Sequence, residues 1–91
     1  MDSRLEALKQ WVAEVLDLRE YELRPASGDA SFRRYFRITV PGSSCIVMDA
    51  PPERENPRRY VEVAQRLRAL GLNVPEILEQ DLERGFLLVS D

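Results

Sequence analysis

Two short segments in the middle of the chain constrain its fold more than any other feature. Between residues 35 and 40, apolar side chains occupy every second position (Phe36, Ile38 and Val40), which is the period of a half-buried β-strand. The turn-forming sequence Pro-Gly-Ser-Ser follows at 41–44, and the apolar run 45–48 reads as a central strand. Two strands joined by so short a turn pair antiparallel. The sequence therefore predicts an antiparallel hairpin at the centre of the fold.

A third strand is predicted before this hairpin. Residues 21–24 (Tyr-Glu-Leu-Arg) alternate, and Pro25 is expected to end the strand because proline has no N–H to donate. Residues 26–31 are small and polar, which predicts a loop. The three strands then form an antiparallel meander.

A helix is predicted on each side of the meander. Ser3 and Glu6 form a capping box, and apolar residues at helical spacing follow, which predicts a helix over residues 4–17. Trp11 is expected to lie in the core or on a docking surface. Asn56 and Pro57 are typical of a helix start, and a glycine at position 71 is typical of a helix end. The apolar stripe of this second helix is expected to be Tyr60, Val63, Ala64, Leu67 and Leu70.

Two further strands complete the predicted fold. Residues 77–78 favour a short strand, residues 81–85 a turn, and residues 86–89 (Phe-Leu-Leu-Val) a fully apolar strand. The order helix, three strands, helix, two strands predicts an α+β domain. Its expected core is one mostly antiparallel five-stranded sheet with two helices.

Composition excludes several classes of function. A chain of 91 residues accommodates one domain. It has no histidine and a single cysteine, Cys45, which excludes a Ser-His-Asp or Cys-His centre, a histidine-bound metal and an internal disulfide within these residues. No apolar run is long enough to span a bilayer, and no secretion signal is found, so we expect a cytoplasmic protein without a membrane partner. The net charge of −3 argues against a nucleic-acid partner.

The loop before the central hairpin is the best candidate for chemistry. Its small residues, Ser27 to Ser31, can expose backbone N–H groups that hold phosphate oxygens, and Arg33 and Arg34 can add charge-assisted contacts. A single glycine is a weak phosphate signal, so an ordinary hairpin loop remains the alternative from these residues alone.

The chain stops at Ser90-Asp91, directly after its most apolar strand. Domains usually end in a polar tail. We therefore expect residues 1–91 to be a fragment of a larger protein.

Four stretches carry a resemblance to a known family. They are residues 28–38 (Gly-Asp-Ala-Ser-Phe-Arg-Arg-Tyr-Phe-Arg-Ile), 47–53 (Val-Met-Asp-Ala-Pro-Pro-Glu), 73–78 (Asn-Val-Pro-Glu-Ile-Leu) and 86–91 (Phe-Leu-Leu-Val-Ser-Asp). Together they resemble the N-terminal lobe of the aminoglycoside phosphotransferase and choline kinase family, which has a protein-kinase-like fold. The first two stretches are most similar to bacterial cell-wall-recycling kinases that phosphorylate the anomeric hydroxyl of N-acetylmuramate and N-acetylglucosamine.

The resemblance implies an ATP site. In this fold the loop between the first two strands covers the ATP phosphates; the corresponding residues here are Ser27, Gly28, Asp29, Ala30, Ser31 and Arg33. Val47, with Ile38 and Val89, is expected to contact the adenine. Ser90 and Asp91 would begin the hinge segment, whose backbone groups bind the adenine edge. Mg²⁺ is implied as well, with its ligands in the C-terminal lobe.

One departure from the family pattern concerns the phosphates. Kinase-like folds usually place a Lys or Arg on the third strand to hold them. Counting along the strand puts Asp49 at this position, where a carboxylate cannot serve. Arg33, Arg34 and Arg37 are candidates to replace the missing cation. Glu62, the nearest candidate for the partner glutamate, is expected to face solvent.

The resemblance also implies that the catalytic base and metal ligands lie in a C-terminal lobe outside these 91 residues. The chain alone is therefore expected to be inactive, and the other lobe is an expected partner. The full protein would transfer the ATP γ-phosphate to a sugar hydroxyl. An aminoglycoside, choline or homoserine acceptor remains an alternative, as does a stand-alone interaction module without catalysis. Leu87, Leu88 and Val89 would normally face the other lobe or the nucleotide, so we expect the isolated chain to self-associate.

Overall fold

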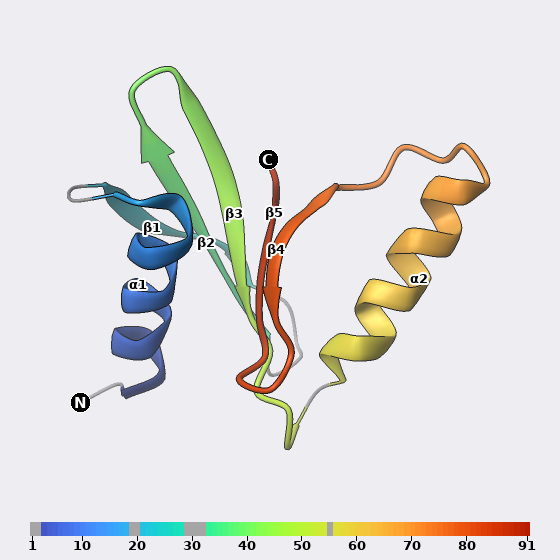
Figure 1. The fold of residues 1–91 in the computed structure, drawn as a ribbon, viewed down its shortest axis with the longest axis horizontal. Coiled ribbons are helices and arrows are strands. Elements are labelled where there is room, and N and C mark those ends of the chain that lie inside the picture. Colours follow the sequence, from blue (N-terminus) through green and yellow to red (C-terminus); the bar gives the residue numbers. More distant parts are fainter. Residues whose placement is uncertain (1–2, 19–20, 29–32, 55) are drawn as a thin grey trace.

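The computed structural model describes residues 3–18, 21–28, 33–54 and 56–91. Its elements are α1 (Ser3–Leu16), β1 (Glu22–Gly28), β2 (Arg34–Val40), β3 (Ser43–Asp49), α2 (Pro57–Ala69), β4 (Ile77–Asp81) and β5 (Phe86–Ser90). They form a five-stranded sheet of order β1-β2-β3-β5-β4, in which all neighbouring strands run antiparallel (Figure 1). The predicted α+β fold with two helices is confirmed.

Helix α1 covers one face of the sheet (Figure 1). Its buried residues Leu8, Trp11 and Val12 pack against a cluster contributed by β2, β3 and β5: Phe36, Ile38, Val47, Phe86 and Leu88. The rings of Trp11 and Phe86 lie 5.7 Å apart at their centroids. Trp11 is therefore a core residue, the first of its two expected places. We call this side of the sheet the α1 face.

Helix α2 lies on the opposite side of the sheet, which we call the α2 face. Its Val61 packs against Met48, Ala50, Leu87 and Val89. The residues of α2 that are buried (Pro57, Val61 and Ala64) all lie in its first eight positions. The helix therefore contacts the sheet through its N-terminal half.

The predicted apolar stripe of α2 needs a correction. Val61 is buried, whereas Val63 is 44% exposed and Leu70 is 77% exposed. The predicted stripe was wrong at both positions: Val63 lies on a side of the helix turned away from the sheet, and Leu70 lies beyond the N-terminal half that contacts it. Glu62 is exposed, as predicted.

Strand β1 is longer than predicted. It continues through Pro25 to Gly28, so Ala26, Ser27 and Gly28 lie in a strand and not in a loop. The pairing register with β2 shifts between Pro25 and Gly28, where the ladder is irregular. β1 is an edge strand, and edge strands and bulges are the places where a sheet tolerates proline. Asp29, Ala30 and Ser31 lie outside the described residues.

The expectation that Leu87, Leu88 and Val89 are exposed in the isolated chain was wrong. β5 lies between β3 and β4, and Leu87, Leu88 and Val89 are all buried within this chain. The large apolar side chains that are exposed are instead Val63, Leu70, Leu72 and Leu78. Self-association stays a prediction, but these residues of α2, β4 and their connection are now its basis. Among the described residues, no helix is long and apolar enough to cross a membrane.

Candidate functional site

A pocket of about 360 Å³ opens on the α2 face, between the sheet and α2. We call it the sheet pocket; it is lined by Ala26, Tyr35, Arg37, Ile46, Tyr60, Pro75, Val89, Ser90 and Asp91. Alternation along the strands explains the lining. Tyr35 and Arg37 of β2, and Ile46 of β3, point away from α1 because their neighbours Phe36, Ile38 and Val47 point toward it. The pocket thus has aliphatic and aromatic walls with a polar rim.

Asp91 holds the polar rim together. Arg37 donates to its carboxylate from Nε at 2.7 Å and from Nη2 at 3.1 Å, and Ser44 donates from Oγ at 2.6 Å. Arg37 was a candidate to replace the missing phosphate-binding cation. Its guanidinium is instead engaged by Asp91, so it orders the end of β5.

These contacts make Asp91 a stronger acid. The hydrogen bonds from Arg37, then that from Ser44, lower the pKa of Asp91 from 3.8 to about 2. A depressed folded-state pKa means that the contact stabilises the fold fully above pH 3.8 and is lost as the pH falls toward about 2.

Nuclear magnetic resonance titration of the Asp91 carboxyl carbon should give this low pKa, and Arg37→Gln should raise the pKa. A wild-type Asp91 that titrates near 3.8 would contradict the contact.

Ser90 ties the segment before β4 to the end of β5. Its backbone N–H donates to the carbonyl of Glu76 at 2.8 Å, and its Oγ accepts from the Glu76 N–H at 2.8 Å. The Ser90 amide is therefore engaged within the chain.

A second pocket of about 280 Å³ lies beside the start of α2. We call it the arginine pocket; it is lined by Arg33, Asn56, Arg59, Tyr60 and Val63. Asn56 caps the helix by accepting a hydrogen bond from the Arg59 N–H at 3.1 Å. Two guanidiniums here favour an anionic ligand. Tyr60 lines both pockets.

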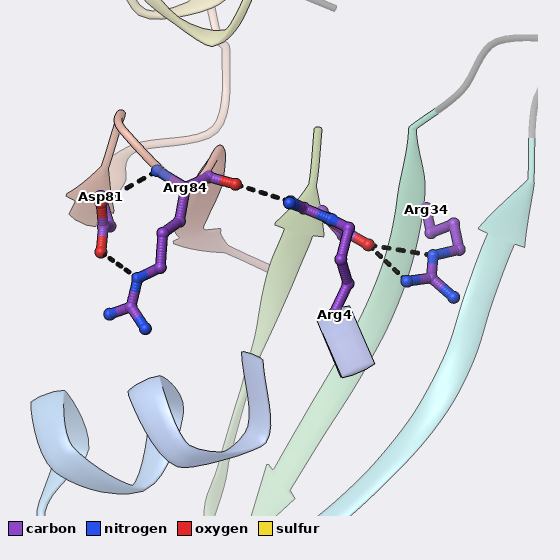
Figure 2. A network of polar contacts seen from close by, with 5 residues as sticks. Arg4, Arg34, Asp81 and Arg84 are labelled. Atoms are coloured by element: carbon purple, nitrogen blue, oxygen red, sulfur yellow. Dashed lines mark hydrogen bonds and ion pairs between the residues drawn. The ribbon is translucent and has the colours of Figure 1, made fainter. Parts of the chain in front are cut away.

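Asp49 does not occupy the position predicted for it. Side chains alternate along β3, so Ile46 and Met48 lie on the α2 face, and Asp49 lies on the α1 face with Val47. Its carboxylate is fully buried and paired with Arg4 of α1 and Arg34 of β2. Figure 2 labels both arginines. Counting along the sequence placed Asp49 at the phosphate-holding position of the third strand, but the strand turns this side chain to the α1 face. Arg34 is engaged by Asp49, so it is not available as a replacement cation.

Comparison with known proteins identifies the family. The phosphotransferase enzyme family matches residues 22–91. The chain belongs to this family. It is 47% identical to an N-acetylmuramate/N-acetylglucosamine kinase of Pseudomonas aeruginosa, over 99% of the chain and 30% of that protein. A kinase of the same name in Pseudomonas putida is 44% identical, with the same coverage. In Neisseria meningitidis serogroup B another is 42% identical, over 92% of the chain and 25% of that protein.

The chain therefore spans about 30% of the length of the first two curated relatives. No solved structure matched it.

The structure brings together some of the residues expected for a phosphotransferase nucleotide site and separates others. Ser90 and Asp91 line the sheet pocket, and Arg33 lines the arginine pocket. Val47 and Ile38 are core residues on the α1 face and contact neither pocket. Ser27 and Gly28 belong to β1, next to the pocket residue Ala26.

Several lining residues were missed from the sequence. Tyr35 and Ile46 could have been found, because alternation alone places them opposite Phe36 and Val47. Tyr60 was expected only as part of the apolar stripe of α2, and Pro75 carries no local signal. Their place in the pocket depends on how α2 and the segment after it pack on the sheet.

One further titratable side chain, the Cys45 thiol, lines neither pocket. Burial, and then the charge of Asp91, raise the pKa of the Cys45 thiol, which packs at the edge of the α1-face core. At neutral pH this thiol is therefore less ionised than a free cysteine side chain, which makes it a weaker nucleophile. Among the residues that the structure describes, no three His, Cys, Asp or Glu side chains are grouped to hold a metal ion.

Proposed function

We propose that residues 1–91 form the nucleotide-binding lobe of an ATP-dependent sugar kinase. The observation that carries the proposal is the pair of pockets that meet at Tyr60, one mainly apolar and one lined by two arginines. A nucleotide has the same two parts, a flat apolar base and a charged phosphate chain. The names of the relatives support N-acetylmuramate and N-acetylglucosamine as acceptors, and we propose their anomeric hydroxyl as the group phosphorylated.

The sheet pocket suits the base. Its volume of about 360 Å³ falls within the range of small-molecule sites, which are mostly apolar with a few polar groups. In our proposal Ile46 and Val89 contact the adenine ring where Val47 was first expected. The rim formed by Ser90 and Asp91 then lies at the adenine edge.

The arginine pocket suits the phosphates. Arg33 and Arg59 come from separate elements, and guanidinium groups bind phosphate oxygens in pairs. We propose that Arg59 supplies the positive charge that related folds take from the third strand. The loop residues Ser27, Gly28, Asp29, Ala30 and Ser31 remain proposed phosphate contacts through their backbone N–H groups. Magnesium would neutralise phosphate charge in such a reaction, and its ligands and the catalytic base are proposed to lie in a C-terminal lobe.

The reaction is tested on the full-length protein. Purified kinase is expected to consume ATP when given N-acetylmuramate or N-acetylglucosamine, and to release ADP and the sugar 1-phosphate. Parallel assays with an aminoglycoside, choline and homoserine test the alternative acceptors. Transfer to none of these would favour the non-catalytic interaction module, and ATP turnover by residues 1–91 alone would contradict the two-lobe proposal.

The role of Arg59 is tested against its neighbour Arg58. Arg59→Ala should raise the KM for ATP about tenfold or more, because a charge-assisted contact to phosphate is worth about 1.5–3 kcal/mol. Arg58 is exposed on the same helical turn and lines neither pocket, so Arg58→Ala should change the KM less than twofold. Steady-state kinetics of the two full-length variants provide the measurement. Equal effects would mean that general positive charge matters, and not the arginine pocket.

A further inference from the structure

The carboxylate of Asp49 joins two elements that are far apart in the sequence. On one oxygen, Oδ1, it accepts from Arg4 Nε at 2.9 Å and Nη2 at 2.5 Å. On the other, Oδ2, it accepts from Arg34 Nε at 3.0 Å and Nη2 at 2.5 Å (Figure 2). The carboxylate is fully buried, whereas the side chains of Arg4 and Arg34 are 30% and 39% exposed. We call this arrangement the Asp49 clamp.

A buried ion pair is by itself weak evidence for stability. Removing a carboxylate from water is costly, and its partners repay that cost only when their geometry is good. Apolar residues of similar size often serve a core position as well or better. The position lies next to the apolar cluster around Phe86, over which Arg4 stacks at 5.1 Å. A charged group here is therefore better explained by what it holds in place.

What the clamp holds is the start of β2. In the sheet, Arg34 is paired with Gly28 of β1 on one side and with Asp49 of β3 on the other. Arg33 directly precedes Arg34, and their side chains point to opposite faces. Arg34 reaches Asp49 on the α1 face, and Arg33 lines the arginine pocket on the α2 face. Fixing the Arg34 guanidinium from one side therefore fixes where Arg33 emerges on the other.

We propose that Asp49 is a positioning residue for phosphate binding. By holding Arg34 on the α1 face, it sets Arg33 in the arginine pocket without touching the ligand itself. The proposal rests on the proposed function, since it takes the anion of that pocket to be the phosphate chain of ATP.

The network offers its own control, because its two halves are separable. Arg4 also donates from Nη2 to the carbonyl of Arg84 at 2.6 Å, and Arg84 pairs with Asp81 at 2.7 Å (Figure 2). This half ties α1 to the turn between β4 and β5 and includes neither Arg33 nor Arg34. Loss of Arg4 should therefore lower stability without disturbing the start of β2.

The test compares full-length wild type with Asp49→Asn, Arg34→Lys and the control Arg4→Ala. Calorimetry gives the Kd for ATP, and kinetics give the KM for ATP and for the sugar. Asp49→Asn and Arg34→Lys should weaken ATP binding about tenfold, because a small misplacement of a binding group has effects of at least this order. The KM for the sugar should stay within twofold. Arg4→Ala should lower the melting temperature but keep the Kd for ATP within twofold.

Two results would overturn the proposal. One is an unchanged Kd for ATP in Arg34→Lys. This variant keeps the positive charge but loses the two-pronged contact with Asp49. Because the Arg34 side chain is partly exposed, Arg34→Lys should fold even if Asp49→Asn does not. The other is a loss of affinity in Arg4→Ala equal to that in Asp49→Asn, which would make the network purely structural.

A readout without nucleotide separates this proposal from the proposed function. Nitrogen-15 relaxation at the Arg33 amide should show added fast motion in Arg34→Lys and not in Arg4→Ala. A wild-type protein that binds no ATP would contradict the proposed function, while the relaxation data would still decide whether the clamp positions Arg33. Equal relaxation in all variants would overturn the clamp even if ATP binds.

Discussion

Replacing Gly85 with alanine is expected to lower the free energy of unfolding by about 3 kcal/mol or more. Gly85 has a φ of +82°, in the left-handed region that side chains disfavour. A Cβ at this position would lie 1.9 Å from the carbonyl oxygen and 2.8 Å from the carbonyl carbon of Ala50. These are backbone atoms, and the Ala50 N–H donates to the Gly85 carbonyl at 2.7 Å, so neither side can move without breaking that contact. Chemical denaturation of the 91-residue chain measures the loss.

Gly42 provides the matched control for Gly85→Ala. It has a similar φ of +79°, but a methyl group added here would meet nothing within 4 Å, so Gly42→Ala carries only the backbone strain of about 1–2 kcal/mol. The difference between the two variants isolates the close approach of Ala50. Equal losses would contradict the packing of the β4–β5 turn against the end of β3.

The order of elements could be predicted because it depends on local signals. The turns predicted at 41–44 and 81–85 connect strands as expected, although β3 already begins at Ser43 and β4 continues to Asp81. Asn56 caps α2 with its side chain, as its place before Pro57 predicted. Pro25 misled the prediction because its effect depends on where the strand lies in the sheet. At an edge with an irregular register, β1 continues past it.

The candidate site was less predictable because it depends on contacts between distant residues. Arg37 and Asp91 are 54 positions apart, and they meet only because β3 pairs with both β2 and β5. Counting along the sequence assigned Asp49 to the phosphate-holding position of the third strand. Such counting does not show which face of the sheet a side chain lies on. The partner of Asp49, Arg4, lies 45 positions away in α1, and no local pattern links the two.

Because β5 is a central strand, truncation of Leu88 should also lower the stability of the fold strongly. The Leu88 side chain is 0% exposed and packs on the α1 face with Trp11 and Phe86. Leu88→Ala should lower the free energy of unfolding by about 2–5 kcal/mol, through lost burial and the cavity left behind. That is a large part of the about 5–15 kcal/mol that stabilises a typical domain. Leu70→Ala removes the same atoms from a side chain that is 77% exposed, and should change the stability by at most about 0.5 kcal/mol.

The variants Leu88→Ala and Leu70→Ala also test whether β5 is an exposed apolar surface or a buried central strand. If β5 formed a surface for another lobe, Leu88→Ala would leave the stability of the chain unchanged and reduce its self-association. With β5 between β3 and β4, Leu88→Ala instead lowers the denaturation midpoint, and Leu70→Ala reduces any self-association. Denaturation and sedimentation of both variants therefore report on different faces of the molecule. A stable Leu88→Ala chain would place the core elsewhere, because no fully buried leucine of a central strand can be truncated without cost.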